Sequence, residues 1–310
     1  MTPIRIAVVG VGKIARDQHL PAIAGNGAFS LAATVSPDCA GPVVAGTPHF
    51  ADLDTLLAQG PAVDAVALCT PPQVRYRLAA RALGAGVHVF LEKPPGATLG
   101  EVRALEVQAE KVGASLFTAW HSRFAAGVAP ARAWLAERRI ERVAISWRED
   151  VRVWHPGQAW IWQPGGLGVF DPGINALSIL THIMPRPVFL TAATLHLPAN
   201  RAAPIAADLA FADTSGAPIT MDLDWRQTGP QSWDIVVETD AGVLRLAHGG
   251  AVLTLPGGTQ HNEDLEYPGL YARFASLVRA GRSDVDLAPL RLVADAFLRG
   301  KREAVEPFHD

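Results

Sequence analysis

The sequence predicts two domains, a doubly wound α/β domain with a parallel sheet and an α+β domain with a large, mostly antiparallel, open-faced sheet. The length of 310 residues suits two domains of ordinary size. Short apolar runs alternate with helical patterns up to about Trp120, as a parallel sheet requires. Later segments alternate apolar and polar residues, which is typical of strands with one wet face. We therefore expect one domain over 1–120 and a second over 121–310.

The first domain opens with an apolar strand from Ile4 that runs directly into a glycine turn. The turn, Gly10-Val11-Gly12-Lys13-Ile14-Ala15, has the form GxGxxA. Its first glycine permits a tight turn, its second lets the backbone approach a pyrophosphate, and its small third position lets helix and strand pack closely. Phosphates would lie at the start of the helix that begins near Gly12. Strand, turn and helix together predict a Rossmann-type dinucleotide site.

The other elements of this domain alternate along the chain. We expect strands at 31–35, 63–68, 87–91 and 116–119, and helices at 52–59, 74–85 and 99–112. Thr98 and Glu101 predict a capping box for the last of these helices. Thr70-Pro71-Pro72 breaks the chain at the carboxyl end of a strand, which is the edge where open α/β sheets bind ligands.

The second domain has the clearest strand of the chain, in which Ile219, Met221, Leu223 and Trp225 alternate with polar residues. Further strands are expected at 143–147, 189–197, 205–211, 233–239 and 243–246, and helices at 128–137 and 168–181. The C-terminal helix, 289–304, is a candidate to pack back on the first domain.

Composition excludes several classes of partner. With 27 basic and 30 acidic residues the net charge is −3, so neither nucleic acid nor an anionic membrane is expected as a partner. We find no signal peptide and no membrane span, and Cys39 and Cys69 form no CxxC or Cys/His pattern, so we expect a cytoplasmic protein. No HExxH motif or carboxylate cluster predicts a metal site.

Lys93 is the first candidate for chemistry. It follows the strand at 87–91, so it points toward the place where a nicotinamide should lie. Pro94 and Pro95 fix the backbone just beyond it, which presents the ammonium from a stiff support. The alternative is a solvated lysine paired with Glu92. The isomer of the Lys93–Pro94 bond is left open.

Asp171 and Asn175 lie four residues apart on a predicted helix and therefore share one face. A carboxylate and an amide there could take a proton from a hydroxyl and hold its oxygen. The alternative is a helix-start aspartate that the helix dipole favours, with an incidental asparagine.

The densest aromatic cluster suggests a sugar site. Its flat apolar faces with polar tips suit the faces of a sugar ring, although a packed loop or an oligomer contact is an equal alternative. The cluster consists of Trp154, His155, Trp160 and Trp162. His121, at the predicted domain junction, either lines the cleft or is hydrogen-bonded in place.

Asp38 bears on the choice of nicotinamide coenzyme. It lies just past the second strand, where an acidic residue accepts hydrogen bonds from the adenosine ribose, and it therefore favours NAD. Ser36 could instead donate to a 2′-phosphate, so NADP stays an alternative. The candidate coenzyme-binding residues are Gly10, Gly12, Lys13, Ile14, Ser36, Asp38, Thr70, Pro71, Glu92 and Lys93.

Four features together resemble the Gfo/Idh/MocA oxidoreductase family: the glycine turn, Thr70-Pro71-Pro72, Glu92-Lys93-Pro94 and Asp171. Within that family, the chain is similar over nearly its whole length to bacterial aldose 1-dehydrogenases that act on L-arabinose and D-galactose. The segments that carry this similarity are 12–19, 91–100, 154–162 and 165–180.

The resemblance implies that an aldopyranose, D-galactose, L-arabinose or D-fucose, is oxidised at C1 to its lactone, with a hydride passing to NAD(P). It also implies Lys93 and Asp171 as the catalytic centre, assisted by Asn175. Many family members have histidine at the positions that Asn175 and Arg75 occupy in this sequence. An asparagine cannot act as a general base, so the proton goes to Asp171 or to a neutral Lys93. The candidate substrate-binding residues are His121, Glu149, Trp154, His155, Trp160, Trp162, Asp171 and Asn175.

Two other functions stay open. One is an oxidoreductase of the same family that acts on another polyol or a cyclic diol, and the other is a non-enzymatic NAD(P)-binding sensor or regulator. The preferred aldose is also open, because one hydroxymethyl group changes binding by only about 1 to 3 kcal/mol. We expect a homodimer or homotetramer that forms through the open sheet face.

Overall fold

A computed structural model describes residues 2–37, 41, 43–261, 263 and 265–309 of the chain. The chain forms two compact units. Unit 1 comprises Met1–His121 and Tyr267–Asp286, and unit 2 comprises Ser122–Glu266 and Leu287–Asp310. The boundary at His121 lies next to the one expected at 120, but the chain also contributes a later segment to unit 1.

Unit 1 contains a parallel sheet whose strand order, β3-β2-β1-β4-β5-β6, changes direction between β1 and β4. Ligands of doubly wound folds bind at such a switch point, beyond the carboxyl ends of the strands. Strand β4 is apolar and buried throughout, and β5 buries Val89, Phe90 and Leu91, as a sheet covered on both faces requires. The strands are β1 (Ile4–Val9), β2 (Phe29–Val35), β3 (His49–Phe50), β4 (Ala65–Leu68), β5 (His88–Glu92) and β6 (Leu116–Ala119).

Local capping chemistry sets the helix starts of unit 1. The Thr98 side chain accepts from the Glu101 amide, and Glu101 returns the bond, so the expected capping box is confirmed. Asp52 caps α2 in a similar way by accepting from the Thr55 amide at 2.7 Å. The helical segments are the π-helical turn η1 (Ala15–His19), α1 (Leu20–Ala24), α2 (Leu53–Gln59), α3 (Pro72–Gly84), α4 (Leu99–Val112) and α8 (Glu266–Ala280).

The C-terminal helix departs from its expected place. Helix α9 (Ala288–Arg299) packs on α7 (Phe170–Ile183) and β8 (Val188–Pro198) of unit 2, where it buries Leu292, Val293 and Ala296. Strand β15 (Lys301–Val305) follows it. Helix α8, which we did not predict, belongs to unit 1 instead. Its Tyr271 and Phe274 rings pack against Phe90 at 5.2 and 5.5 Å between centroids. Each helix buries its apolar face in the core of one unit, α9 in unit 2 and α8 in unit 1, and this explains why α9 does not pack on the first domain.

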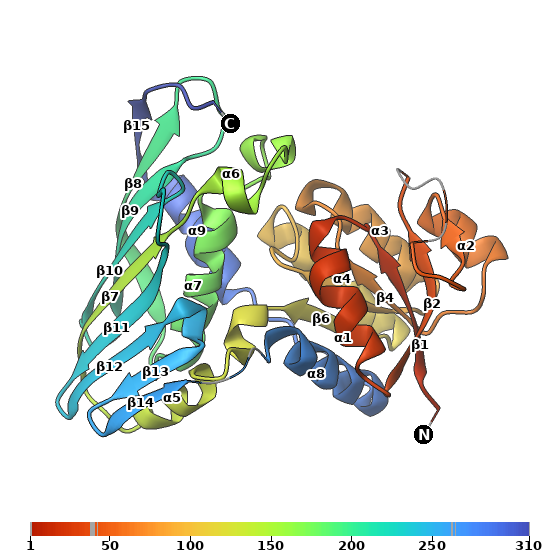
Figure 1. The fold of residues 1–310 in the computed structure, drawn as a ribbon, viewed down its shortest axis with the longest axis horizontal. Helices are drawn as coiled ribbons and strands as arrows, with labels where there is room; N and C mark the ends of the chain where they lie inside the picture. Colours follow the sequence, from red (N-terminus) through yellow and green to blue (C-terminus); the bar gives the residue numbers. More distant parts are fainter. Residues whose placement is uncertain (1, 38–40, 42, 262, 264, 310) are drawn as a thin grey trace. The chain divides into compact units, whose positions relative to one another are not determined.

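Unit 2 contains a mostly antiparallel sheet of order β14-β13-β12-β11-β7-β10-β9-β8-β15, in which the pairs β7/β10 and β8/β15 are parallel (Figure 1). The predicted fold class is therefore confirmed. The strands are β7 (Ile140–Arg148), β8 (Val188–Pro198), β9 (Ala206–Asp213), β10 (Pro218–Asp224), β11 (Ser232–Thr239), β12 (Gly242–Ala247), β13 (Val252–Leu255), β14 (Gly258–His261) and β15.

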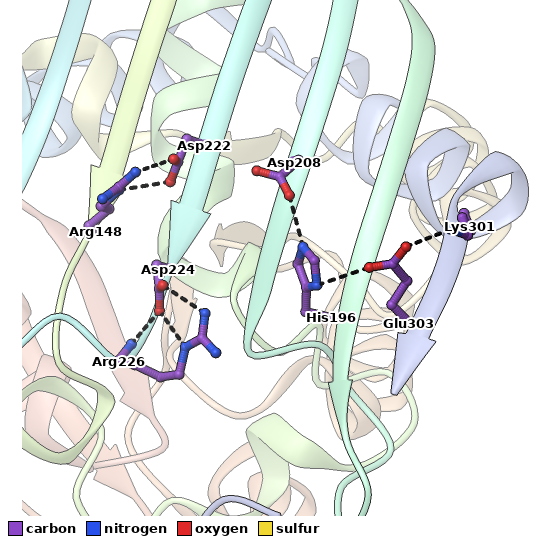
Figure 2. A network of polar contacts seen from close by, with 8 residues as sticks. All are labelled: Arg148, His196, Asp208, Asp222, Asp224, Arg226, Lys301 and Glu303. Atoms are coloured by element: carbon purple, nitrogen blue, oxygen red, sulfur yellow. Dashed lines mark hydrogen bonds and ion pairs between the residues drawn. The ribbon is translucent and has the colours of Figure 1, made fainter. Parts of the chain in front are cut away.

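Helices cover one face of this sheet, and the other face is open (Figure 1). In β10, Ile219, Met221 and Leu223 point into the core and are at most 2% exposed. The open face carries polar pairs between neighbouring strands, among them Arg148 with Asp222 and His196 with Asp208 (Figure 2). The helical segments of unit 2 are α5 (Val128–Leu135), α6 (Val151–Trp154), η3 (Ala159–Trp162), α7 (Phe170–Ile183), η4 (His248–Gly250) and α9. Within the described ranges, no helix combines the length and apolarity that crossing a bilayer requires.

Candidate active site

The glycine turn of unit 1 has the geometry that a dinucleotide needs. Gly10 has φ +88°, and a Cβ there would lie 2.9 Å from the Thr70 backbone nitrogen, so only glycine fits this position. At Gly12, by contrast, a Cβ would meet no atom within 4 Å. The first glycine therefore permits close packing of the turn on the end of β4, and the second leaves open space beside the start of the helix.

The ends of the neighbouring strands add polar groups to this edge. The Thr70 hydroxyl is buried and has no hydrogen-bond partner among the described residues, so it is available to a ligand. Ser36 directly follows β2 and is 9% exposed, and Ile14 is exposed beyond the turn. Lys13 is exposed and forms an ion pair with Asp17. The predicted coenzyme residue Asp38 lies outside the described residues.

A buried arginine holds the segment that carries Lys93. The Arg75 guanidinium is 2% exposed and donates to the carbonyl oxygens of Thr70, Glu92 and Pro94. These bonds join the chain on either side of Lys93 to the turn after β4. The Lys93–Pro94 peptide is cis. Lys93 itself is half-buried, so its side chain lies neither fully in the core nor fully in solvent.

The Glu92 carboxylate points inward, away from the role that we predicted for it. It is 3% exposed, and its Oε1 accepts from the Tyr267 hydroxyl at 2.6 Å and lies 3.3 Å from His19 Nε2. Its Oε2 accepts from the backbone N–H of Lys93. Because both oxygens are engaged inside unit 1, the arrangement favours a supporting role for Glu92 over direct contact with a coenzyme.

Glu92 and His19 form a buried ion pair. Burial opposes the charged imidazole, but interactions with Cys69 and Glu92 outweigh it and raise the pKa of His19 to about 9. Burial also opposes the Glu92 charge, but hydrogen bonding to His19 and the charges of His19, His121 and Lys93 lower the pKa of Glu92 to about 2. Both groups are therefore charged at neutral pH.

In unit 2, the turn before α7 depends on glycine. A Cβ at Gly166 would lie 2.1 Å from the Trp160 carbonyl oxygen, and one at Gly168 would lie 2.3 Å from the Pro204 carbonyl oxygen. Gly168 also has φ +56°. This tight turn places Asp171 in the first turn of α7, where it is 2% exposed.

Asp171 and His155 come together in unit 2. His155 Nε2 lies 3.5 Å from Asp171 Oδ2, although the two residues are on different segments. Asn175 is half-buried one helical turn after Asp171, on the same side of α7. The dipole at the helix start and a specific partner therefore both act on Asp171. A buried carboxylate beside an imidazole is an arrangement that can accept and pass on a proton.

Glu149 lies beyond the end of β7 and is held by two indoles. Its Oε1 accepts from Trp225 Nε1 and its Oε2 from Trp233 Nε1, each at 3.0 Å. The carboxylate is 5% exposed. Two neutral donors thus satisfy a buried charge, and the bonds fix the orientation of both rings.

The predicted aromatic cluster is extended by Trp225 after β10, Trp233 of β11 and Phe308 of the C-terminal segment. Trp225 contacts the His155 ring at 5.2 Å and the Trp162 ring at 5.3 Å between centroids. Trp162 in turn contacts Phe308 at 5.7 Å. Trp154 is 41% exposed and packs edge-on against Trp233, and Trp160 is half-buried in η3.

Several residues of these clusters were missed by sequence reasoning. Trp225 and Trp233 lie in strand patterns and look like ordinary core residues, and His19 and Tyr267 have no motif of their own. His121, a predicted substrate residue, is half-buried in unit 1 and stacks on Tyr267 at 5.5 Å. Across the part of the chain that is described, no group of three or more His, Cys, Asp or Glu side chains could hold a metal ion.

Comparison with known proteins gives the class to which this fold and this glycine turn belong. Residues 4–119 match the Gfo/Idh/MocA model, described as an oxidoreductase family with an NAD-binding Rossmann fold. A full-length relative described below extends the match to the whole chain. The chain therefore belongs to the Gfo/Idh/MocA oxidoreductase family, and the predicted resemblance is confirmed.

The relatives are more specific than the family. The chain is 48% identical over 311 residues to galactose 1-dehydrogenase of Pseudomonas fluorescens, and the match covers 100% of both chains. The crystal structure of D-galactose-1-dehydrogenase from Rhizobium etli is 59% identical, covers 100% of this chain and 99% of its own, and superimposes with a TM-score of 0.95. A 3-ketoreductase from Actinomadura kijaniata, solved with NADP, is 17% identical over 98% of this chain with a TM-score of 0.83, and so shares the fold.

Proposed function

We propose that the chain is an NAD(P)-dependent aldose 1-dehydrogenase that oxidises C1 of an aldopyranose, D-galactose, L-arabinose or D-fucose, to the lactone. The observation that carries the proposal is the full-length similarity to galactose 1-dehydrogenase of Pseudomonas fluorescens. The Asp171–His155 pair beside indole rings supports it, because stacking rings and a proton acceptor are what a sugar oxidation at C1 needs.

The residues of each unit have separate roles in this proposal. Asp171 accepts the proton of the anomeric hydroxyl, Lys93 anchors or polarises the same oxygen, and Asn175 holds it in place. As the C1–H bond breaks, its electron pair leaves as hydride and the C1–O bond becomes the lactone carbonyl, so the sugar loses one hydride and one proton. The nicotinamide, when bound, supplies the hydride acceptor.

The residues around the sugar ring are assigned by chemistry. His155 and the rings of Trp154, Trp160 and Trp162 recognise the ring faces, and His121 and Glu149 are candidates for its hydroxyl groups. A carboxylate offers about four acceptor positions, so Glu149 would accept from sugar hydroxyls at positions other than the two that the indole N–H groups occupy.

The turn of unit 1 is the proposed coenzyme site. Gly10 and Gly12 would carry the pyrophosphate, Ser36 and Asp38 the adenosine ribose, and Thr70, Pro71 and Lys93 the end that carries the nicotinamide. We propose NAD as the preferred coenzyme because a carboxylate at position 38 would repel a 2′-phosphate, with NADP as the alternative. Dissociation constants for NAD and NADP, measured on the wild type and on Asp38→Ser, test this preference, because the variant should lose selectivity.

A substrate panel tests the reaction itself. Purified protein is mixed with D-galactose, L-arabinose, D-fucose, D-xylose, a polyol and a cyclic diol, each with NAD and with NADP, and the absorbance of the reduced coenzyme is followed. Turnover of an aldose with release of its lactone supports the proposal. Turnover of the polyol or the diol alone contradicts it, and coenzyme binding without turnover of any compound favours a sensor.

We also propose a homo-oligomer that forms through the open face of the unit 2 sheet. Phe189, which pairs with Ala212, is 47% exposed, and Val243, which pairs with Glu238, is 50% exposed. Both side chains project from the same face as their polar neighbours, which leaves apolar area for a second copy to bury. Sedimentation analysis of the wild type and of Phe189→Lys tests the proposal, since the variant should dissociate at higher concentration.

A further inference from the structure

Behind Lys93, unit 1 contains a buried polar cluster that the proposed mechanism does not use. The cluster, hereafter the Glu92 cluster, consists of Glu92, His19, Tyr267 and Tyr271, whose exposed fractions are 3%, 0%, 4% and 0%. Its members come from three parts of the chain, namely the end of β5, the π-helical turn η1 and helix α8. A buried polar group costs stability unless it is satisfied, so a cluster of four requires a physical reason.

The contacts of the cluster form a continuous chain. The Tyr271 hydroxyl lies 2.8 Å from His19 Nδ1, His19 Nε2 lies 3.3 Å from Glu92 Oε1, and the Tyr267 hydroxyl donates to the same oxygen at 2.6 Å. An imidazolium donates through both nitrogens, which matches one partner on each side. The π-helical turn places His19 in this position, because its backbone closes through a bond from the Leu20 amide to the Ala15 carbonyl.

The end of the chain of contacts is the backbone of Lys93. Glu92 Oε2 accepts the Lys93 N–H, while Arg75 holds the carbonyl oxygens of Glu92 and Pro94 on either side. The peptide units next to Lys93 are thus fixed by one buried anion and one buried cation. A lysine whose backbone is held in this way presents its ammonium from a fixed origin.

The cluster also controls the charge next to Lys93. The groups that face Glu92 and His19 are Cys69 after β4, Tyr267 and Tyr271 of α8, and His121 and Lys93. With His19 protonated, the His19–Glu92 pair has no net charge. Without that proton or that side chain, the surroundings of the Lys93 ammonium would lose one positive charge that offsets the Glu92 carboxylate.

We propose that His19 is a positioning residue for the reaction, which acts through Glu92 to hold the backbone of Lys93 and to balance the charge beside its ammonium. The proposal rests on the proposed function in one respect, since it takes Lys93 to contact the substrate. The other part, that His19 affects the protonation of the Lys93 side chain, can be measured without any substrate.

Lys93 can be observed directly because the chain has only four lysines, Lys13, Lys93, Lys111 and Lys301. Reductive methylation with ¹³C-formaldehyde labels them together with the N-terminal amine, and Lys93→Met identifies the Lys93 signal. The pKa of Lys93 is then read from a pH titration by NMR in the wild type, His19→Gln, Tyr271→Phe and His88→Gln. His88 is the matched control, because it begins β5 at the end remote from Lys93.

We expect His19→Gln to raise the pKa of Lys93 by about one unit, since glutamine can still donate to Glu92 but carries no charge. Turnover should fall by about ten- to a hundredfold, as expected for a displaced group, while the dissociation constant of NAD changes by less than about twofold. Tyr271→Phe should shift both quantities in the same direction but less, and it serves as the test if His19→Gln does not fold.

Two results overturn the proposal: a Lys93 titration in His19→Gln equal to that of His88→Gln, or a loss of turnover matched by an equal loss of NAD affinity. If the wild type oxidises no aldose, the proposed function fails, and the Lys93 titration alone then decides between a positioning role for His19 and a merely structural one.

Discussion

Two buried carboxylates, Glu92 of unit 1 and Glu149 of unit 2, are held by different chemistry. Glu92 is paired with a cation, His19, and with the Tyr267 hydroxyl. Glu149 accepts from two neutral indole N–H groups. Both are at most 5% exposed, so burial alone does not distinguish them.

The difference indicates what each carboxylate can do. A neighbouring cation cancels the charge of Glu92, which therefore serves to fix the chain next to Lys93. The two indole donors of Glu149 carry no formal charge, so these bonds orient the carboxylate and the rings of Trp225 and Trp233 without cancelling its charge. Unit 1 thus holds the backbone of its candidate lysine next to a buried ion pair, whereas unit 2 orients a buried carboxylate between two indole rings.

We expect the largest effect on turnover from replacing Asp171 or Lys93, the two residues proposed to act on the sugar. We expect Asp171→Asn to lower turnover by about a hundredfold or more, because it removes the proposed proton acceptor, and Lys93→Met to have a loss of similar size. Steady-state kinetics at several pH values measures both. The control is Asp234→Asn, which changes an aspartate on the open face of unit 2. Near-normal turnover in Asp171→Asn would show that the role assignment is wrong.

The next effect is the pH dependence of stability from the His19–Glu92 pair. The pKa of His19 is raised from 6.5 to about 9, so its contribution is complete below pH 6.5 and is lost as the pH rises through about 9. The pKa of Glu92 is lowered from 4.5 to about 2, so its contribution is complete above pH 4.5 and is lost as the pH falls through about 2. Both contributions are complete between pH 4.5 and 6.5.

Urea unfolding of the wild type and of His19→Gln at a series of pH values measures this effect. The stability difference should be largest near pH 6 and should shrink by up to about 3 kcal/mol by pH 10. His261→Gln, which changes an exposed histidine of β14, is the control and should show no such trend. A difference that stays constant from pH 6 to 10 would mean that folding does not raise the pKa of His19.

A smaller effect is expected at Glu149. Glutamine has one oxygen and one NH₂ group, so Glu149→Gln sets a donor against one of the two indole N–H groups and should cost about 1 to 3 kcal/mol of stability. If Glu149 also binds sugar hydroxyls, the KM for the aldose should rise while the NAD affinity stays constant. Melting temperature and KM are compared with those of Glu238→Gln, an exposed residue of β11. A stability loss without a change in KM would restrict Glu149 to a structural role.

Features that depend on local interactions could be predicted from the sequence, whereas those that depend on contacts between distant residues could not. Helix α4 and strand β6 have the predicted bounds, because the capping box and a short apolar run are local signals. The glycine turn was predictable for the same reason. Asp171 could be placed near the start of a helix, but its partner His155 could not be derived from helix spacing.

The clusters could not be predicted because their members meet over long separations. His19 and Tyr271 are 252 residues apart, and Glu92 and Tyr267 are 175 apart. Helix α8 was missed although Leu270, Tyr271, Phe274 and Leu277 recur at helical spacing. Trp225 and Trp233 have strand spacing, and only the fold shows that both indoles donate to one carboxylate.

The smallest effect on stability is expected from an ion pair that is not buried. Arg148 donates two hydrogen bonds to Asp222 on the open face of unit 2, and the two side chains are 42% and 39% exposed (Figure 2). This ion pair should contribute only about 0 to 1 kcal/mol to the stability of the protein, because water competes for both charged groups and salt screens them.

A double-mutant cycle with Arg148→Met and Asp222→Asn measures the coupling energy at low and high salt. If the sheet face is open to water, the coupling is small and decreases with salt, in contrast to the His19–Glu92 pair inside unit 1. If a second copy of the chain covers this face, as proposed above, the pair is desolvated in the oligomer. The coupling then exceeds about 1 kcal/mol, resists salt, and decreases on dilution as the oligomer dissociates. The concentration dependence therefore separates a solvent-exposed ion pair from one that a partner subunit buries.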